Sequence, residues 1–236
     1  MNKSRPYFYS VNLLLENPVY QALLSSDHHL NLGNDTVKFF DPEVSPFVGF
    51  DRKYDKGFSD LYELFPPGRR ILYANPSPIS KPAGWQTTHE IRGLQFVYTA
   101  DQEIRGDYSQ VAPLGVMHIE QMVQLAHLTK PGPFGLRTID FGSYFGIFEK
   151  EQLVAMTGQR LHIKNYTEIS AVCTHPDHTG KGYAHTLLQH QLEIILQQGQ
   201  RPFLHVRDDN ERAIALYQRL GFTISRPMNF FFMKRL

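Results

Sequence analysis

The sequence predicts an α+β protein: a mixed β-sheet flanked by helices in the C-terminal half, preceded by a smaller α+β lobe. Two apolar runs within residues 144–162, separated by the polar stretch Glu149 to Gln152, are typical of a β-hairpin. A further strand, Tyr166 to Cys173, leads through a glycine-containing loop into a helical apolar stripe. The first hundred residues are instead rich in proline and aromatic residues, which sets them apart as a lobe.

The N-terminal lobe, residues 1–107, is predicted to contain a helix and three strands. The helix is expected around Leu13 to Leu24, and the strands near Thr36 to Phe40, Ile71 to Ala74 and Gly93 to Thr99. The polar segment 101–110 lacks periodicity, so the boundary is placed there. The lobe has too many apolar residues for a disordered tail.

The C-terminal domain, residues 108–236, is predicted to start with an amphipathic helix. Its apolar stripe comprises Val116, Ile119, Met122, Val123 and Ala126. A proline- and glycine-rich loop follows at 130–135. After the hairpin, the Tyr166 strand and the helix from Ala184, the expected elements are a strand at 203–206, a helix at 211–220, and a terminal strand pair, 222–225 with 229–234.

The loop before the Ala184 helix has the chemistry of an anion site. A strand that turns into a helix through small residues leaves backbone N–H groups at the positive end of the helix dipole. Gly180 and Gly182 let the backbone approach an anion closely, and Lys181 adds positive charge. The segment therefore predicts a pyrophosphate cradle.

Two common phosphate-binding motifs do not fit this loop. A P-loop requires G-x-x-x-x-G-K-[ST], and no glycine stands at the required position before Gly180. A dinucleotide-binding fold requires G-x-G-x-x-G, but the last position is His185, and Arg201 and Pro202 stand where an acidic residue is expected. An NAD-dependent oxidoreductase is therefore a distant alternative.

A third pattern, [RQ]-x-x-G-x-[GA], fits residues 179–184 except for Thr179 at its first position. Downstream, the chain matches V-x-x-x-N-x-x-A-x-x-L-Y-x-x-x-G-F with Val206, Asn210, Ala213, Leu216, Tyr217, Gly221 and Phe222. With these motifs the chain resembles the GCN5-related N-acetyltransferase (GNAT) superfamily, most closely its FR47-like branch. The resemblance covers residues 140–235 well and 111–139 loosely.

The resemblance implies an acyl-coenzyme A dependent N-acyltransferase, most simply an N-acetyltransferase that acts on a primary amine in a ternary complex. The residues implied in coenzyme A binding are Val172, Cys173, Thr174, Thr179, Gly180, Lys181, Gly182, Tyr183, Ala184, Asn210 and Tyr217. The backbone of residues 172–174 is expected to pair with the pantetheine arm. The competing hypothesis is a regulatory module that binds acyl-coenzyme A without turnover.

Two residues are implied in catalysis. Glu168 lies fourteen positions before Gly182, where histone-acetylating members place their general base. A half-buried carboxylate is expected to have a raised pKa, which suits a base; alternatively, Glu168 faces outward or binds the substrate. Tyr217 is the expected general acid to the thiolate, with a core tyrosine as the alternative. Asn210 is expected to cap its helix and to bind pantetheine.

Cys173 and its neighbouring histidines invite two further interpretations. Direct transfer needs no covalent intermediate, so Cys173 is expected to pack rather than to act as a nucleophile. The histidines at positions 175, 178, 185 and 190 include no i, i+4 pair on one helix face, so no metal site is expected.

Composition restricts the partners. The net charge of +1 gives no electrostatic basis for binding nucleic acid or an anionic membrane. The single cysteine suits a reducing compartment, and neither a signal peptide nor a long apolar run is evident, so a cytoplasmic protein is expected. Homodimerisation is left open. The motifs encode the coenzyme and not the amine acceptor.

The N-terminal lobe is predicted to close one side of the acceptor pocket. Glycine N-acyltransferases, which resemble this chain in their C-terminal half, also carry an N-terminal lobe that looks like a degenerate copy of the same fold. No cradle motif precedes Asp101, so this lobe is not expected to bind coenzyme A. Candidate walls are Trp85, Phe96, Tyr98 and Phe134, with a place in the core as the alternative for each.

Overall fold

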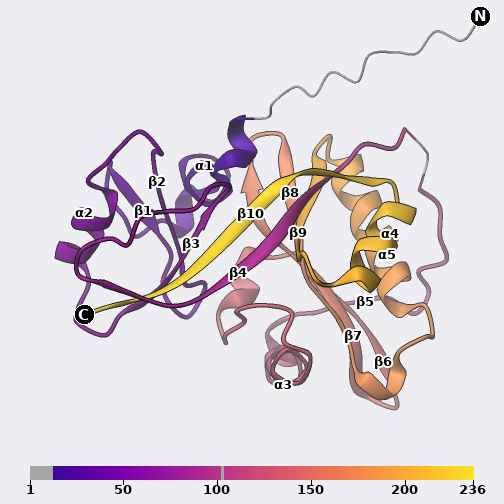
Figure 1. Cartoon of the computed structure of the whole chain (residues 1–236). Coiled ribbons are helices and arrows are strands. Elements are labelled where there is room, and N and C mark those ends of the chain that lie inside the picture. Colours follow the sequence, from indigo (N-terminus) through magenta and orange to yellow (C-terminus); the bar gives the residue numbers. More distant parts are fainter. Residues whose placement is uncertain (1–12, 102–103) are drawn as a thin grey trace, which may run out of the picture.

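A computed structural model describes residues 13–101 and 104–236, and it confirms an α+β fold with one large mixed sheet (Figure 1). The strands are β1 (Val37–Phe39), β2 (Phe47–Phe50), β3 (Arg70–Asn75), β4 (Trp85–Tyr98), β5 (Ala112–Pro113), β6 (Phe145–Glu149), β7 (Gln152–Ile163), β8 (Tyr166–Thr174), β9 (Arg201–Arg207) and β10 (Phe222–Arg235). The helices are α1 (Pro18–Leu24), α2 (Gly57–Leu64), α3 (Ile119–Thr129), α4 (Tyr183–Gln197) and α5 (Glu211–Arg219), with short 3₁₀ turns between elements.

The sheet joins the two predicted domains. Its strand order is β1-β2-β3-β10-β4-β9-β8-β7-β6-β5, so β4 from the predicted N-terminal lobe lies between β9 and β10. In Figure 1, β4 and β10 run side by side through the middle of the molecule. The predicted boundary at residue 107 therefore does not separate two sheets, because β4 is the strand that joins β9 to β10.

The helices cover both faces of the sheet. Side chains alternate along a strand, so neighbouring residues of β9 belong to different cores. Phe203 packs in one core with α1 and α3, whereas Leu204 packs in a second core with α4 and α5. No helix among the described residues is long and apolar enough to cross a membrane.

Several predicted elements differ in extent from those observed. The first helix of the C-terminal domain starts at Ile119, and Val116 lies in a 3₁₀ turn with 80% of its surface exposed. The expected terminal strand pair is one continuous strand, β10. A register shift between Ile224 and Arg226 leaves Ser225 out of the pairing with β4, and a bulge of this kind bends a strand without ending it.

Candidate active site

The site begins where two parallel strands separate. β8 and β9 pair only through residues 166–168 and 201–203. β8 then forms a bulge, because Ala171 and Val172 both lie opposite Thr157 between the paired positions Ser170 and Cys173. Ala171 adopts φ 52°, an uncommon conformation for a residue other than glycine. From Ile169 onward, this edge of β8 is therefore not paired with β9.

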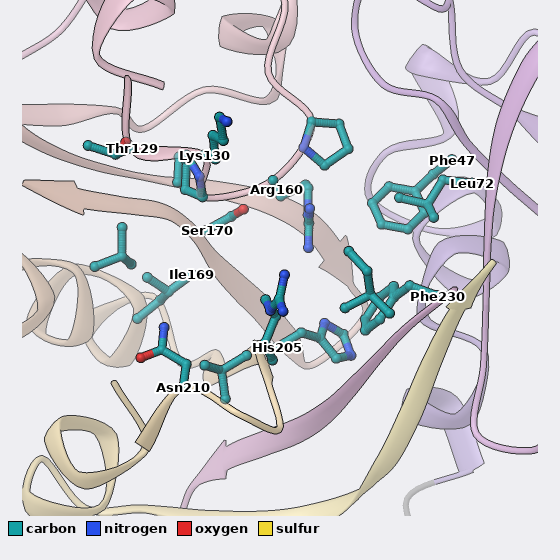
Figure 2. Close-up of a pocket in the computed structure, with 18 of the residues that line it drawn as sticks. Phe47, Leu72, Thr129, Lys130, Arg160, Ile169, Ser170, His205, Asn210 and Phe230 are labelled. Carbon is teal, nitrogen blue, oxygen red and sulfur yellow. The ribbon is translucent and has the colours of Figure 1, made fainter. Parts of the chain in front are cut away.

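A cavity of about 290 Å³ occupies the opening. Its lining comes from β8 and β9, from the start of α5, from the loop after α3, and from the N-terminal strands. Figure 2 shows Ile169 and Asn210 on one side, Phe47, Leu72 and Phe230 on the other, and Arg160 and Ser170 between them. The prediction that N-terminal residues close one side of this pocket is supported by Phe47 and Leu72. None of the four candidate wall residues lines this cavity: Trp85, Phe96 and Tyr98 are buried in the cores and Phe134 packs beside a core, so the alternative given for them, a place in the core, is confirmed.

The predicted cradle lies at the N-terminus of α4. Gly180 and Gly182 both adopt φ 84°, and α4 begins at Tyr183. The first N–H groups of a helix have no partner within the helix. A Cβ atom placed on either glycine meets no atom within 4 Å, so the positive φ, and not crowding, requires glycine here.

Tyr217 and Asn210 lie at the same cavity. Burial raises the pKa of Tyr217 to about 12, so its hydroxyl keeps its proton at neutral pH. Asn210 caps α5, with its Oδ1 accepting from Ala213 N at 3.2 Å, which confirms the predicted cap. A protonated hydroxyl and an unpaired strand edge thus line one opening, and the predicted cradle follows the end of β8, outside the lining of this cavity.

Known proteins share this fold. Residues 144–230 match the family of FR47-like proteins. A protein from Novosphingobium aromaticivorans, assigned to the GNAT acetyltransferases, superposes with a TM-score of 0.87 at 28% identity over 94% of this chain and 98% of its own. Residues 144–230 are thus similar to FR47-like proteins, and the chain has the fold of the GNAT acetyltransferases.

More distant GNAT structures share the fold alone. A GCN5-related N-acetyltransferase from Kribbella flavida has a TM-score of 0.58 at 14% identity, over 90% of this chain and 95% of its own. An acetyltransferase from Colwellia psychrerythraea has a TM-score of 0.50 at 15% identity, over 84% and 80%. No curated protein matches the sequence significantly.

The lysine of the predicted cradle is engaged by an acidic residue of the β6–β7 hairpin. Glu149 Oε1 accepts from Lys181 Nζ at 2.6 Å and from the Tyr183 hydroxyl, and lies 3.2 Å from His178 Nδ1. Bonds from Lys181, Tyr183 and His178, in that order of strength, lower the pKa of Glu149 to about 2. Glu149 thus places a negative charge beside the predicted pyrophosphate site.

Glu168 is wholly buried and bound on both carboxylate oxygens. Arg160 donates from Nε to Oε2 at 2.8 Å and from Nη2 to Oε1 at 2.6 Å, and His205 Nδ1 lies 2.7 Å from Oε1. Burial alone raises the pKa of Glu168, but Arg160 and His205 outweigh it and lower the pKa to about 2. The expected rise of the pKa towards neutrality is therefore wrong, because the sequence did not show these two partners.

His205 lines the cavity with both ring nitrogens engaged. Because ionised Glu168 can only accept, Nδ1 carries the proton of that bond. Gln95 Nε2 lies 3.0 Å from His205 Nε2 and donates to Leu15 O at 2.8 Å, so Nε2 of His205 is the acceptor. Both contacts hold His205 in place, and in this arrangement it has no free nitrogen with which to take a proton from an amine.

Three other residues predicted for the coenzyme A site are Cys173, Thr174 and Thr179. Burial raises the pKa of the Cys173 thiol to about 11, in keeping with packing rather than nucleophilic attack. Thr179 donates to Pro176 O at 3.0 Å, and Thr174 ends β8. The described residues include no cluster of three or more His, Cys, Asp or Glu side chains placed to bind a metal ion.

Sequence reasoning missed Arg160, His205 and Phe47. Arg160 and His205 could have been found as polar residues within apolar strands. Arg160 interrupts the buried run of β7, and His205 lies between two apolar residues of β9. Phe47 could not be found from the sequence, because nothing marks this phenylalanine, which lies far from the cradle along the chain, as a wall of this cavity.

Proposed function

We propose that this protein is an acyl-coenzyme A dependent N-acyltransferase, most simply one that transfers acetyl from acetyl-coenzyme A to a primary amine in a ternary complex. The GNAT fold implies this reaction class. The observation that carries the proposal is the unpaired β8 edge, which lines one cavity together with Tyr217 and leads along the chain into the glycine cradle at the start of α4.

Each part has a role in this proposal. The N–H groups of residues 180–184 bind the pyrophosphate, with Thr179 and Lys181 beside them. The backbone of Val172, Cys173 and Thr174 pairs with pantetheine as a neighbouring strand does, and one of its N–H groups polarises the thioester carbonyl. Asn210 contacts the pantetheine arm. Tyr217 gives its proton to the departing thiolate, for which its protonated state is suited.

The structure does not favour Glu168 as the general base that deprotonates the amine, the role expected from the sequence. Glu168 is ionised but occupied by Arg160 and His205, so we propose that it positions these two side chains. The amine then loses its proton to water. An apolar lining and the nearby Arg160 guanidinium both disfavour an ammonium ion, which lowers the pKa of a bound amine and increases the reactive form.

The test is release of coenzyme A thiol by the full-length chain, with acetyl-coenzyme A and a panel of amines. Turnover above the slow hydrolysis background in the presence of an amine supports the proposal, with the acetylated amine identified by mass spectrometry. The occupied state of Glu168 is the one observation that favours the competing binding module. Tight binding of acetyl-coenzyme A without acetylation of any amine would establish that module instead.

A further inference from the structure

The cavity has two chemically different ends. One end, with Asn210, Tyr217 and the unpaired edge of β8, is the one proposed above for the coenzyme arm and thioester. The other end is lined by Phe47, Leu72, Ile91, Phe230 and Phe232, all apolar. Figure 2 shows Phe47, Leu72 and Phe230 grouped on the side opposite Asn210. This second end is where an acceptor amine can reach the thioester.

The lining is one-sided in charge. None of the described residues that line the cavity is an aspartate or glutamate, whereas Lys130, Arg160 and Arg207 are basic. Glu168 lies behind the lining and is wholly buried. A second cationic group on an acceptor therefore finds no carboxylate here and loses its hydration in an apolar surrounding, which is costly.

Arg160 stands at the junction of the two ends. Its guanidinium lies over the Phe47 ring, 4.9 Å from the centroid. Its bonds to Glu168 use Nε and Nη2, two of the five N–H donors of a guanidinium. The Arg160 side chain is 14% exposed and lines the cavity, so its remaining donors are available to a ligand there.

The aromatic side chains form a continuous wall beside this guanidinium. Phe47 and Phe230 meet edge to face with centroids 6.5 Å apart, and Phe230 meets the His205 ring at 5.3 Å. Since Glu168 and Gln95 hold His205, and Arg160 covers Phe47, this wall is positioned before a ligand arrives. Such a wall accommodates an aromatic or branched apolar group next to an anion bound by Arg160.

From this arrangement we propose that the acceptor is an amine that carries a carboxylate and an apolar group, most simply an apolar or aromatic α-amino acid. Arg160 binds the carboxylate, and Phe47, Leu72 and Phe230 contact the apolar group. The amine nitrogen attacks the thioester carbonyl, the carbon–sulfur bond breaks, the thiolate takes a proton from Tyr217, and the amine proton goes to water. This inference rests on the proposed function.

The first experiment compares matched acceptors with the full-length chain and acetyl-coenzyme A. Phenylalanine and phenethylamine share the aromatic arm and differ in the carboxylate, whereas lysine and spermidine add a cation. We expect kcat/KM for phenylalanine to exceed that for phenethylamine by roughly 10- to 100-fold, as for the loss of charge-assisted hydrogen bonds. Lysine and spermidine should be the poorest acceptors.

A double variant tests whether Arg160 causes the preference for phenylalanine over phenethylamine. Arg160→Met combined with Glu168→Gln removes both charges, so no buried ion is left unpaired. In this variant the ratio of phenylalanine to phenethylamine kcat/KM should fall to about one, while the affinity for acetyl-coenzyme A changes little. Arg207→Met is the matched control: it removes another lining cation, which Asp209 engages at 2.7 Å, and should leave the ratio as in the wild type.

The outcomes separate the two proposals. Failure to bind acetyl-coenzyme A contradicts the proposed function itself. Binding of acetyl-coenzyme A with turnover of phenethylamine, lysine or spermidine at least as fast as phenylalanine leaves the proposed function standing and overturns the inference. Binding of acetyl-coenzyme A without acetylation of any carboxylate-bearing amine also overturns it. If the double variant does not fold, Arg160→Lys keeps a charge beside Glu168 but loses the planar fork, and should lower the same ratio.

Discussion

At the residue scale, Glu168 shows how far a motif position determines chemistry. Its place on the strand before the cradle was predicted from the sequence, and it lies there. Its protonation depends on Arg160, eight residues earlier on β7, and on His205, thirty-seven residues later on β9. Partners across a sheet have no fixed sequence separation, so the direction of the pKa shift could not be predicted.

Glu168→Gln should destabilise the fold, because it leaves Arg160 buried without its counter-charge. We expect a loss of about 3 kcal/mol in the free energy of unfolding at pH 7. The lowered pKa of Glu168 stabilises the fold above its ordinary value of 4.5, and this contribution disappears as pH falls towards about 2. Urea unfolding should therefore show a smaller difference between variant and wild type at pH 3.

The exposed Glu90→Gln on β4 is the control for this measurement, and it should change stability little at either pH. Equal stability of Glu168→Gln and wild type at pH 7 would contradict the buried ion-pair arrangement. A base role for Glu168 would regain support if the variant kept its stability but lost its rate, with recovery at high pH.

Tyr217→Phe should lower kcat by roughly 10²-fold or more with little change in acetyl-coenzyme A affinity, since it removes a proton donor and keeps the ring. The ring packs against Phe96 and Phe222, so the fold should persist. Single-turnover kinetics and calorimetric binding measure the two effects. Tyr166→Phe, at the start of β8 and outside the cavity lining, is the control; an unchanged kcat in Tyr217→Phe would remove the hydroxyl from the reaction.

At the element scale, the strand–loop–helix unit around the cradle was fully predictable. Its determinants are local: the β8 pattern, Gly180 and Gly182, and the apolar stripe of α4. The α5 cap at Asn210 was predicted for the same reason. By contrast, α2 and β2 were not predicted. The four residues of β2 are too few to show a strand period.

Gly182→Asp should abolish acetyl-coenzyme A binding. The aspartate must adopt φ 84° and brings a negative charge to the N–H groups proposed to hold the pyrophosphate. Gly199→Asp is a matched control after the other end of α4, with φ 71° and equally open surroundings. Gly199→Asp should strain the backbone to a similar degree, but it should still bind acetyl-coenzyme A. Calorimetry on both variants tests the site, and equal affinities would contradict it.

Glu149→Gln should tighten acetyl-coenzyme A binding by several-fold at low ionic strength. The change removes the carboxylate that engages Lys181, Tyr183 and His178, and frees the Lys181 charge for the pyrophosphate. The gain should shrink as salt is added. Glu151→Gln, exposed on the same hairpin, should have a smaller effect. Weaker binding by Glu149→Gln would mean that Glu149 positions Lys181 for the anion.

At the scale of the whole molecule, the sequence predicted the fold class and failed on connectivity. Periodicity identified the second half of β4 and most of β10 as strands, but it does not state which strands are neighbours. The polar segment after Tyr98 suggested a domain boundary, yet β4 pairs with β10 over thirteen positions and with β9 over five. The cavity walls from Phe47 and Leu72 were unpredictable for the same reason.

From this connectivity we expect that the C-terminal residues do not fold without β3 and β4. A chain that begins at Ser109 lacks β3 and β4, which are the two sheet partners of β10, and it exposes the edge of β9. It should be insoluble or unfolded and fail to bind acetyl-coenzyme A. Residues 1–108 and 109–236 produced together should restore both properties, because every strand then regains its neighbours. Circular dichroism, urea unfolding and calorimetry on the fragment and the pair measure this. A fragment 109–236 that folds cooperatively and binds acetyl-coenzyme A by itself would instead establish the boundary at residue 107 as a true domain boundary.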